Sequence, residues 1–200
     1  GVLHAIEPPG GARVLDDVSA RLGYDRESAN SVLSLGLDYS LSSINFLDPF
    51  AEGQFFEDDP LEEGDLAQDR GERAQISARF SFETGRSDPL GFILSGRYRE
   101  RTYSGTTDPD LFDTRTFSLS GTARATLSPV SEARLVLSYE DYSAEDALRT
   151  ERRTTSLSLG LTQVLSATDI LEVSLGTQRI ETEQTFLGIP LSDTQTGLIG

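Results

Sequence analysis

One stretch, TTSLSLGLTQVLSATDILEVSLGTQ at residues 154–178, constrains the fold of this chain more than any other feature. Leucine or valine occupies alternate positions on both sides of a break at residues 166–169, and the positions between them are mostly small or polar. Alternation with period two is the pattern of a β-strand, whose successive side chains point to opposite faces. The stretch is therefore predicted to form a hairpin with one aliphatic face and one polar face.

The same alternation recurs along most of the chain. Further strands are predicted at residues 17–25, 31–42, 73–84, 90–102, 114–127 and 132–142. No segment shows a sustained helical period with capping residues. Strands of ordinary globular proteins average about 5–6 residues. The strands predicted here run to about 9–13 residues, the length that crosses a bilayer at a tilt.

The connections between these strands alternate in length. Short turns are predicted at residues 26–30, 85–89, 128–131 and 166–169. Longer connections are predicted at residues 43–72, 103–113, 143–150 and 181–193. Successive connections of an up-and-down sheet lie at opposite rims, so the short turns are expected at one rim and the long loops at the other. This asymmetry is typical of outer-membrane barrels, which have short periplasmic turns and long extracellular loops.

The aromatic residues of the apolar face are predicted to lie near its two ends. Toward the long loops they are Tyr39, Tyr98, Phe117 and Tyr139, and toward the short turns they are Tyr24, Phe82 and Phe92. Aliphatic and small residues fill the middle of the face. Aromatic girdles around an aliphatic band are typical of a lipid-facing surface, whereas a soluble core more often places large aromatics in mid-strand.

Three architectures use hairpins of this kind: a β-sandwich, a soluble barrel and a membrane barrel. A water-exposed outer surface is expected to be rich in lysine and glutamate, but the polar face here is mainly serine, threonine and glycine. We therefore predict an all-β, antiparallel up-and-down transmembrane β-barrel. Residues 1–200 are expected to form one region of a larger barrel, with eight strands and the start of a ninth, and residues 1–16 an N-terminal loop or lead-in segment. The alternatives are a soluble barrel or sandwich and a repetitive extracellular β-structure.

The hairpins at residues 114–139 and 154–178, with turns such as LSPVSEARL and LSATDILEV, resemble those of Gram-negative outer-membrane β-barrel proteins. Across residues 13–200 the chain looks most like the porin-like barrels found beside exopolysaccharide-export genes. The resemblance implies a place in the bacterial outer membrane, with passive diffusion or polysaccharide export as its role. It also implies contacts with membrane lipid, lipopolysaccharide and polysaccharide-export components, and it implies no catalytic residues. The terminal strand ending in an aromatic residue, usual in this class, is missing from the sequence.

Charged side chains on the polar face are candidates for lining a pore. By the alternation, they are Arg21, Arg79, Arg97, Arg99, Arg124 and Arg134 together with Asp38, Glu83, Glu140 and Glu172. Opposed charges in a pore create a transverse field that selects among solutes, and the arginines would favour anionic or sugar-like solutes. Arg97 and Arg99 lie two positions apart on one strand and are the best candidates for a pore-lining pair. The alternative is that these charges pair across strands and fill a wet lumen.

Other features argue against several functions. The formal net charge of −16 argues against nucleic-acid binding, which needs a basic surface. The chain has no cysteine, so thiolate chemistry is excluded. The acidic loop at residues 55–69 is a weak candidate for divalent cations, and its spacing does not fit an EF-hand. Its carboxylates are Asp58, Asp59, Glu62, Glu63 and Asp65.

The single histidine, His4, lies before the first predicted strand and is expected to be a loop residue, so serine–histidine catalysis on the strands is not expected. We therefore predict no enzymatic activity and no cofactor. The function expected from the sequence is a passive or export-associated outer-membrane channel for small or sugar-like solutes. Two alternatives remain open: a structural or adhesive surface barrel with a plugged lumen, and a soluble ligand-binding β-domain.

Overall fold

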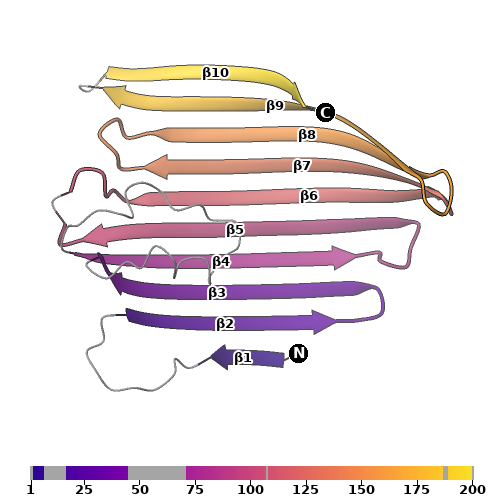
Figure 1. The fold of residues 1–200 in the computed structure, drawn as a ribbon, viewed down its shortest axis with the longest axis horizontal. Helices are drawn as coiled ribbons and strands as arrows, with labels where there is room; N and C mark the ends of the chain where they lie inside the picture. The colour runs from indigo at the N-terminus through magenta and orange to yellow at the C-terminus, as the bar shows by residue number, and fades with distance from the viewer. Residues whose placement is uncertain (1, 7–16, 45–70, 107, 187–188, 200) are drawn as a thin grey trace.

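A computed structural model describes residues 2–6, 17–44, 71–106, 108–186 and 189–199. They form one antiparallel sheet in which each strand pairs with the next along the chain, and β1 and β10 are its edges (Figure 1). The strands are β1 Val2–Ile6, β2 Asp17–Glu27, β3 Ser31–Ser43, β4 Glu72–Thr84, β5 Leu90–Ser104, β6 Thr114–Ser128, β7 Ser131–Ala144, β8 Glu151–Val164, β9 Ile170–Phe186 and β10 Ile189–Ile199. The predicted all-β, up-and-down antiparallel fold is confirmed. No helix in the described part of the chain is long and apolar enough to span a membrane.

The eight predicted strands correspond to β2–β9, and β10 is the predicted start of a ninth. Two predictions are wrong in part. Residues 2–6, placed in a loop or lead-in segment, form β1 and pair with β2. The long loop predicted at residues 181–193 is absent, because β9 continues to Phe186 and β10 begins at Ile189. The alternation of apolar residues fades there, and pairing with neighbouring strands maintains the extended backbone.

The two rims of the sheet differ as the connection lengths predicted. Residues 28–30, 85–89, 129–130 and 165–169 form the short turns, which we call the short-turn rim (Figure 1). Residues 7–16, 44–71, 105–113 and 145–150 connect strands at the opposite rim, where residues 187–188 are the one short exception. The asymmetry therefore holds for the whole sheet apart from the β9–β10 connection.

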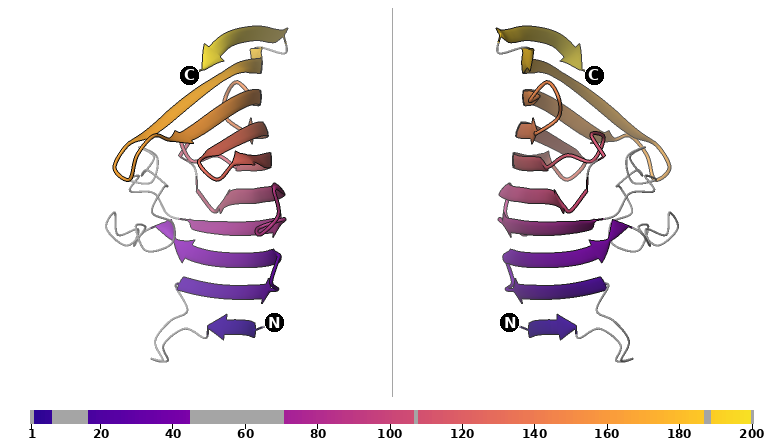
Figure 2. Two further views of the ribbon diagram at one scale, coloured as in Figure 1. Left: turned by 90° about the vertical axis from the view of Figure 1, so that its right-hand side faces the viewer. Right: turned by 90° about the vertical axis from the view of Figure 1, so that its left-hand side faces the viewer.

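Burial in this sheet is the reverse of that in a globular protein. Only three apolar residues in the described ranges are buried, and all of them lie at the long-connection rim: Ile44, Leu111 and Ala144. The aliphatic face is open instead, with Leu159 60% and Leu175 65% exposed. The most buried polar residues, Arg73, Arg101 and Ser77, lie on the opposite face. The sheet is bent, and its β8–β9 end leans out of the plane of β2–β5 (Figure 2).

The aliphatic face forms a band that runs diagonally across the strands. When paired residues are followed from strand to strand, Tyr39 on β3 leads in six steps to Glu183 on β9. The aliphatic edge on β9 is nevertheless Leu175, eight residues closer to the short-turn rim. The other edge of the band shifts in the same direction. Phe82 on β4 leads through the paired residues to Thr177 on β9. The edge of the band on β9 is Leu171, six residues closer to the short-turn rim. At about 3.3 Å per residue and about 4.8 Å between strands, a shift of this size means that the strands are tilted by about 40° from the perpendicular to the band.

The predicted aromatic residues mark the edges of this band. Phe82, Phe92, Phe117 and Tyr39 are all exposed on the aliphatic face. The rings of Phe117 and Tyr139 pack at a centroid distance of 6.4 Å. The hydroxyl of Tyr98 donates to Glu100 at 2.8 Å, just beyond the band. An apolar body with a polar tip directed beyond the band is the arrangement that aromatic residues adopt at a membrane–water boundary.

Candidate functional site

The polar face carries a row of serines across six adjacent strands. Pairing places Ser34, Ser81, Ser95, Ser120, Ser138 and Ser156 directly opposite one another from β3 to β8. Ser138 and Ser156 share a hydrogen bond of 2.6 Å between their hydroxyl oxygens. Each hydroxyl both donates and accepts, so the row presents both kinds of hydrogen-bonding group on the polar face of the sheet.

The neighbouring row, closer to the long-connection rim, holds the principal charges. Arg79 on β4 lies directly opposite Arg97 on β5, which lies opposite Ser118 on β6. Ser118 lies opposite Glu140 on β7. The two rows line a cavity of about 490 Å³ that extends from Asp25 on β2 to Glu140. Arg79, Arg97 and Glu140 of the predicted pore-lining set are therefore brought together in one open, polar site.

Arg97 and Arg99 lie on the same face of β5, as the alternation predicted, but they belong to different rows. Arg99 lies opposite Ser77 and Thr116, one row closer to the long-connection rim than the cavity. The next arginine on this face, Arg101, is only 8% exposed. Arg101 was not among the predicted pore-lining residues, although its spacing from Arg99 was a sufficient signal. These arginines make β5 the most basic strand of the polar face.

A cross-strand ion pair joins Arg21 on β2 to Asp38 on β3, which are directly opposed. This pair follows the alternative interpretation of the charged residues, in which opposite charges neutralise one another across strands. Glu172 on β9 lies opposite Thr162 on the polar face. Some charges of this face therefore pair with each other, as Arg21 and Asp38 do, whereas Arg79, Arg97 and Glu140 line the cavity.

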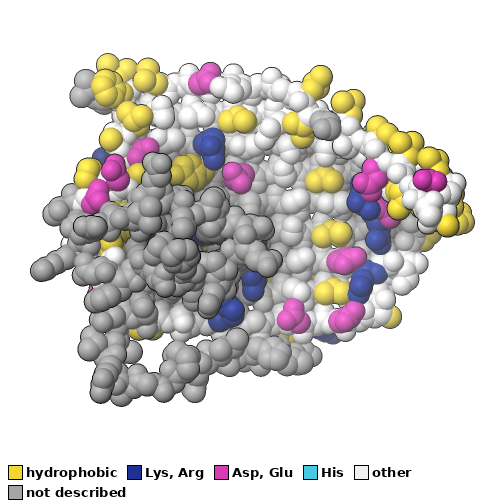
Figure 3. Space-filling view, in the orientation of Figure 1, with side chains coloured by type: hydrophobic (Ala, Val, Ile, Leu, Met, Phe, Trp, Pro, Cys, Tyr) yellow, Lys and Arg dark blue, Asp and Glu magenta, His cyan; other side chains and the backbone are white. Residues whose placement is uncertain are grey.

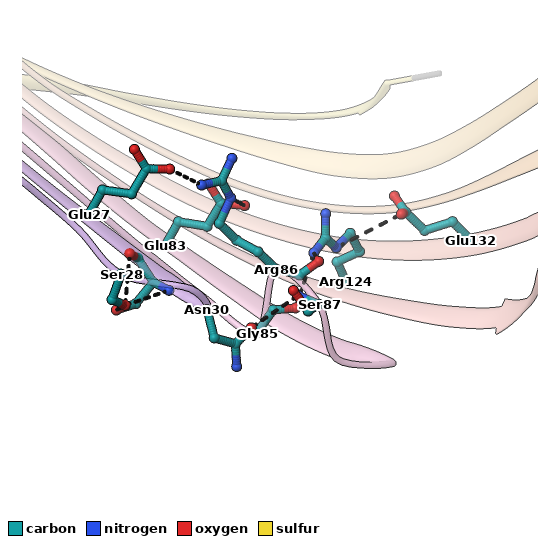
Figure 4. Close-up of polar contacts among 10 residues, drawn as sticks. Glu27, Ser28, Asn30, Glu83, Gly85, Arg86, Ser87, Arg124 and Glu132 are labelled. Carbon is teal, nitrogen blue, oxygen red and sulfur yellow. Dashed lines mark hydrogen bonds and ion pairs between the residues drawn. The ribbon is translucent and has the colours of Figure 1, made fainter.

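A second group of predicted pore-lining residues belongs to a network at the short-turn rim. Arg134 contacts Glu132 at 2.6 Å, and Arg124 lies 3.8 Å from the same carboxylate. Arg124 also donates to the carbonyl oxygens of Gly85 at 3.2 Å and Arg86 at 3.4 Å (Figure 4). Arg124 thereby attaches β6 to the β4–β5 turn, and its role in the fold is to hold that turn.

Arg86 and Asn30 link the β4–β5 turn to the hairpin of β2 and β3. Arg86 contacts Glu27 at 2.8 Å and Glu83 at 3.8 Å. Asn30 accepts hydrogen bonds from the amides of Gly85 and Ser87, each at 3.0 Å (Figure 4). The charged side chains near the short-turn rim are visible at the right of Figure 3. Glu83, Arg124 and Arg134 are therefore close to structural partners and away from the cavity.

The remaining predictions concern metals and the histidine. No group of three or more metal-ligating side chains occurs within the described ranges. The acidic loop with Asp58, Asp59, Glu62, Glu63 and Asp65 lies outside them, so its cation site stays a prediction. His4 was predicted to be a loop residue, but it lies in β1 opposite Gly23.

Comparison with known proteins gives only distant likenesses, and these are among solved structures. No family model and no curated protein matches the chain. Among solved structures, the chain is similar to OmpT (in-vitro folded), an outer membrane protein of Vibrio cholerae, with 9% identity and a TM-score of 0.49. The match covers 91% of this chain and 52% of that one, so the chain spans about half the length of the protein it matches.

Proposed function

We propose that this chain is part of an outer-membrane β-barrel that provides a water-filled path for small hydrophilic solutes. The observation that carries the proposal is the diagonal band of exposed aliphatic residues. A flat apolar patch for protein docking has no reason to drift steadily from strand to strand. A planar lipid layer crossing tilted strands requires this drift, and the tilt of about 40° falls within the range of about 35–45° typical of such barrels.

The polar face supports the second half of the proposal. In a membrane barrel the face opposite the lipid lines the lumen, and here that face carries hydroxyls, the Arg21–Asp38 ion pair and an open cavity. Side chains of serine and glycine leave space that larger residues would fill. Passive diffusion is therefore favoured over a plugged structural barrel. Export of a polysaccharide would use the same water-filled path for one kind of solute.

The test is refolding of the full-length protein into detergent micelles, followed by gel migration with and without boiling. A closed barrel resists the detergent of the gel, so a shift on boiling together with β-type circular dichroism is the expected result. Steady single-channel openings in planar bilayers would then support the conduit. A barrel without openings would support the plugged alternative, and a monodisperse protein in plain buffer without a boiling shift would overturn the proposal.

A further inference from the structure

Glycines occupy two facing positions on the polar face, where the cavity reaches β2 and β3. Gly23 on β2 lies directly opposite Gly36 on β3, and Gly36 lies directly opposite Arg79 on β4. All three belong to the cross-strand row that contains Arg97. A glycine within a strand weakens it and often marks a place where another group comes close to the backbone. The question is which group comes close here.

The side chain of Arg79 makes this approach at Gly36. A Cβ built on Gly36 would lie 2.6 Å from Nε, 2.9 Å from Cγ and 3.4 Å from Cδ of Arg79. The arginine therefore extends sideways across β3, whereas the side chains of a strand ordinarily stand roughly perpendicular to the sheet. In this orientation it remains exposed and lines the cavity. A Cβ built on Gly23, in contrast, would meet nothing within 4 Å.

The next residue of β4 has the same relation to a glycine on the aliphatic face. A Cβ built on Gly96 of β5 would overlap the ring of Phe80, which lies directly opposite. Arg79 and Phe80 therefore lie across glycines on opposite faces of the sheet, one over β3 and the other over β5. On the polar face the consequence concerns space, because a side chain that lies along the wall fills less of the lumen than one that stands out from it.

We propose that Gly36 is a positioning residue that sets the width of the path at this level, because it allows Arg79 to lie against the wall. A side chain at position 36 would lift Arg79 away from β3 and into the lumen, and the largest solute able to pass would become smaller. This inference rests on the proposed function and deepens it by naming a residue that determines the size of the solutes. It concerns volume and therefore applies to neutral solutes.

The test is the swelling of liposomes that contain the refolded full-length protein, in a series of neutral polyethylene glycols of increasing mass. Gly36→Ala should lower the largest mass that enters the liposomes. Gly23→Ala adds the same methyl group at the directly opposed position and should leave this limit unchanged. Equal limits for the wild type and Gly36→Ala, or equal losses in the two alanine variants, would overturn the inference.

Two further variants test the orientation of Arg79. Arg79→Ala should leave the limit almost unchanged, because the side chain that it removes lies against the wall. When Gly36→Ala is combined with Arg79→Ala, the limit should return to that of Arg79→Ala alone. A clear widening by Arg79→Ala, or a loss that persists in the combined variant, would contradict the role of Gly36.

A boiling shift for each variant establishes that the barrel is folded. Arg79→Ala does not depend on the folding of Gly36→Ala, so it tests the orientation of the arginine by itself. Wild-type liposomes that do not swell in the smallest glycol would count against the proposed function. Wild-type liposomes that swell, with a limit insensitive to Gly36→Ala, would count against this inference alone.

Discussion

The two faces of the sheet follow opposite rules, although their residues alternate one by one along each strand. Leu159 is 60% exposed, and its neighbour Ser158 on the other face is partly buried. In a globular protein the aliphatic residue would be the buried one. The proposed membrane barrel accounts for the difference, because in such a barrel the aliphatic face contacts lipid, and the backbone ladder and the membrane stabilise the fold in place of a packed core.

The largest expected effect tests which face contacts lipid. Leu159→Arg should destabilise the protein by about 2–4 kcal/mol, because it places a cation at the lipid face near the middle of the band. Ser158→Arg should cost much less, since its side chain remains on the lumen side. Urea titrations of both variants in lipid vesicles measure the two losses, and equal losses would contradict the assignment of the faces.

The next prediction tests where the polar face has space for a side chain in place of a glycine. A Cβ at Gly176 would lie 2.6 Å from the carbonyl oxygen of Leu157 and 2.7 Å from Cβ of Ser158. Gly176→Ala should therefore force the β8–β9 ladder apart at a cost of about 1–3 kcal/mol. Gly160→Ala is the matched control, because its Cβ would meet nothing closer than 3.8 Å. The urea midpoint of Gly160→Ala should be unchanged or raised, and a loss similar to that of Gly176→Ala would refute the close approach.

A third prediction concerns the two opposed arginines that share Glu132. Arg124→Met removes two bonds to turn carbonyls and should cost about 1–2 kcal/mol. Arg134→Met removes only a half-exposed ion pair, which is worth less than about 1 kcal/mol. Proteolysis within the β4–β5 turn, followed by mass spectrometry, should increase only in the first variant. Increased cleavage in both would mean that Arg124 does not hold the turn.

The smallest effect is expected within the serine row. Ser138→Ala and Ser156→Ala remove the two partners of one hydrogen bond. A double-mutant cycle should give a coupling of about 0.5–1 kcal/mol, the net value of a neutral hydrogen bond. Coupling near zero would indicate that both hydroxyls are better satisfied by lumenal water.

The strands could be predicted because alternation is a local signal that a single sequence contains. β9 was predicted only in part, since its polar end, residues 179–186, has no apolar alternation and depends on pairing with β8 and β10. The site was harder to predict. Parity assigned Arg97 and Arg124 to one face, but only the register places Arg97 opposite Arg79 and Arg124 beside the turn carbonyls. Register is a property of neighbouring strands, so one strand's sequence does not specify it.

The diagonal of the aliphatic band has a consequence for the serine row. The row runs at right angles to the strands, so in a tilted barrel it follows a spiral, like the thread of a screw. It begins near the short-turn edge of the band on β3 and reaches the opposite edge on β8. Over about 24 Å of sheet this is a climb of about 15 Å, half the thickness of the hydrocarbon layer. In the proposed barrel, a hydrophilic solute that moves from hydroxyl to hydroxyl along this row turns about the barrel axis as it advances.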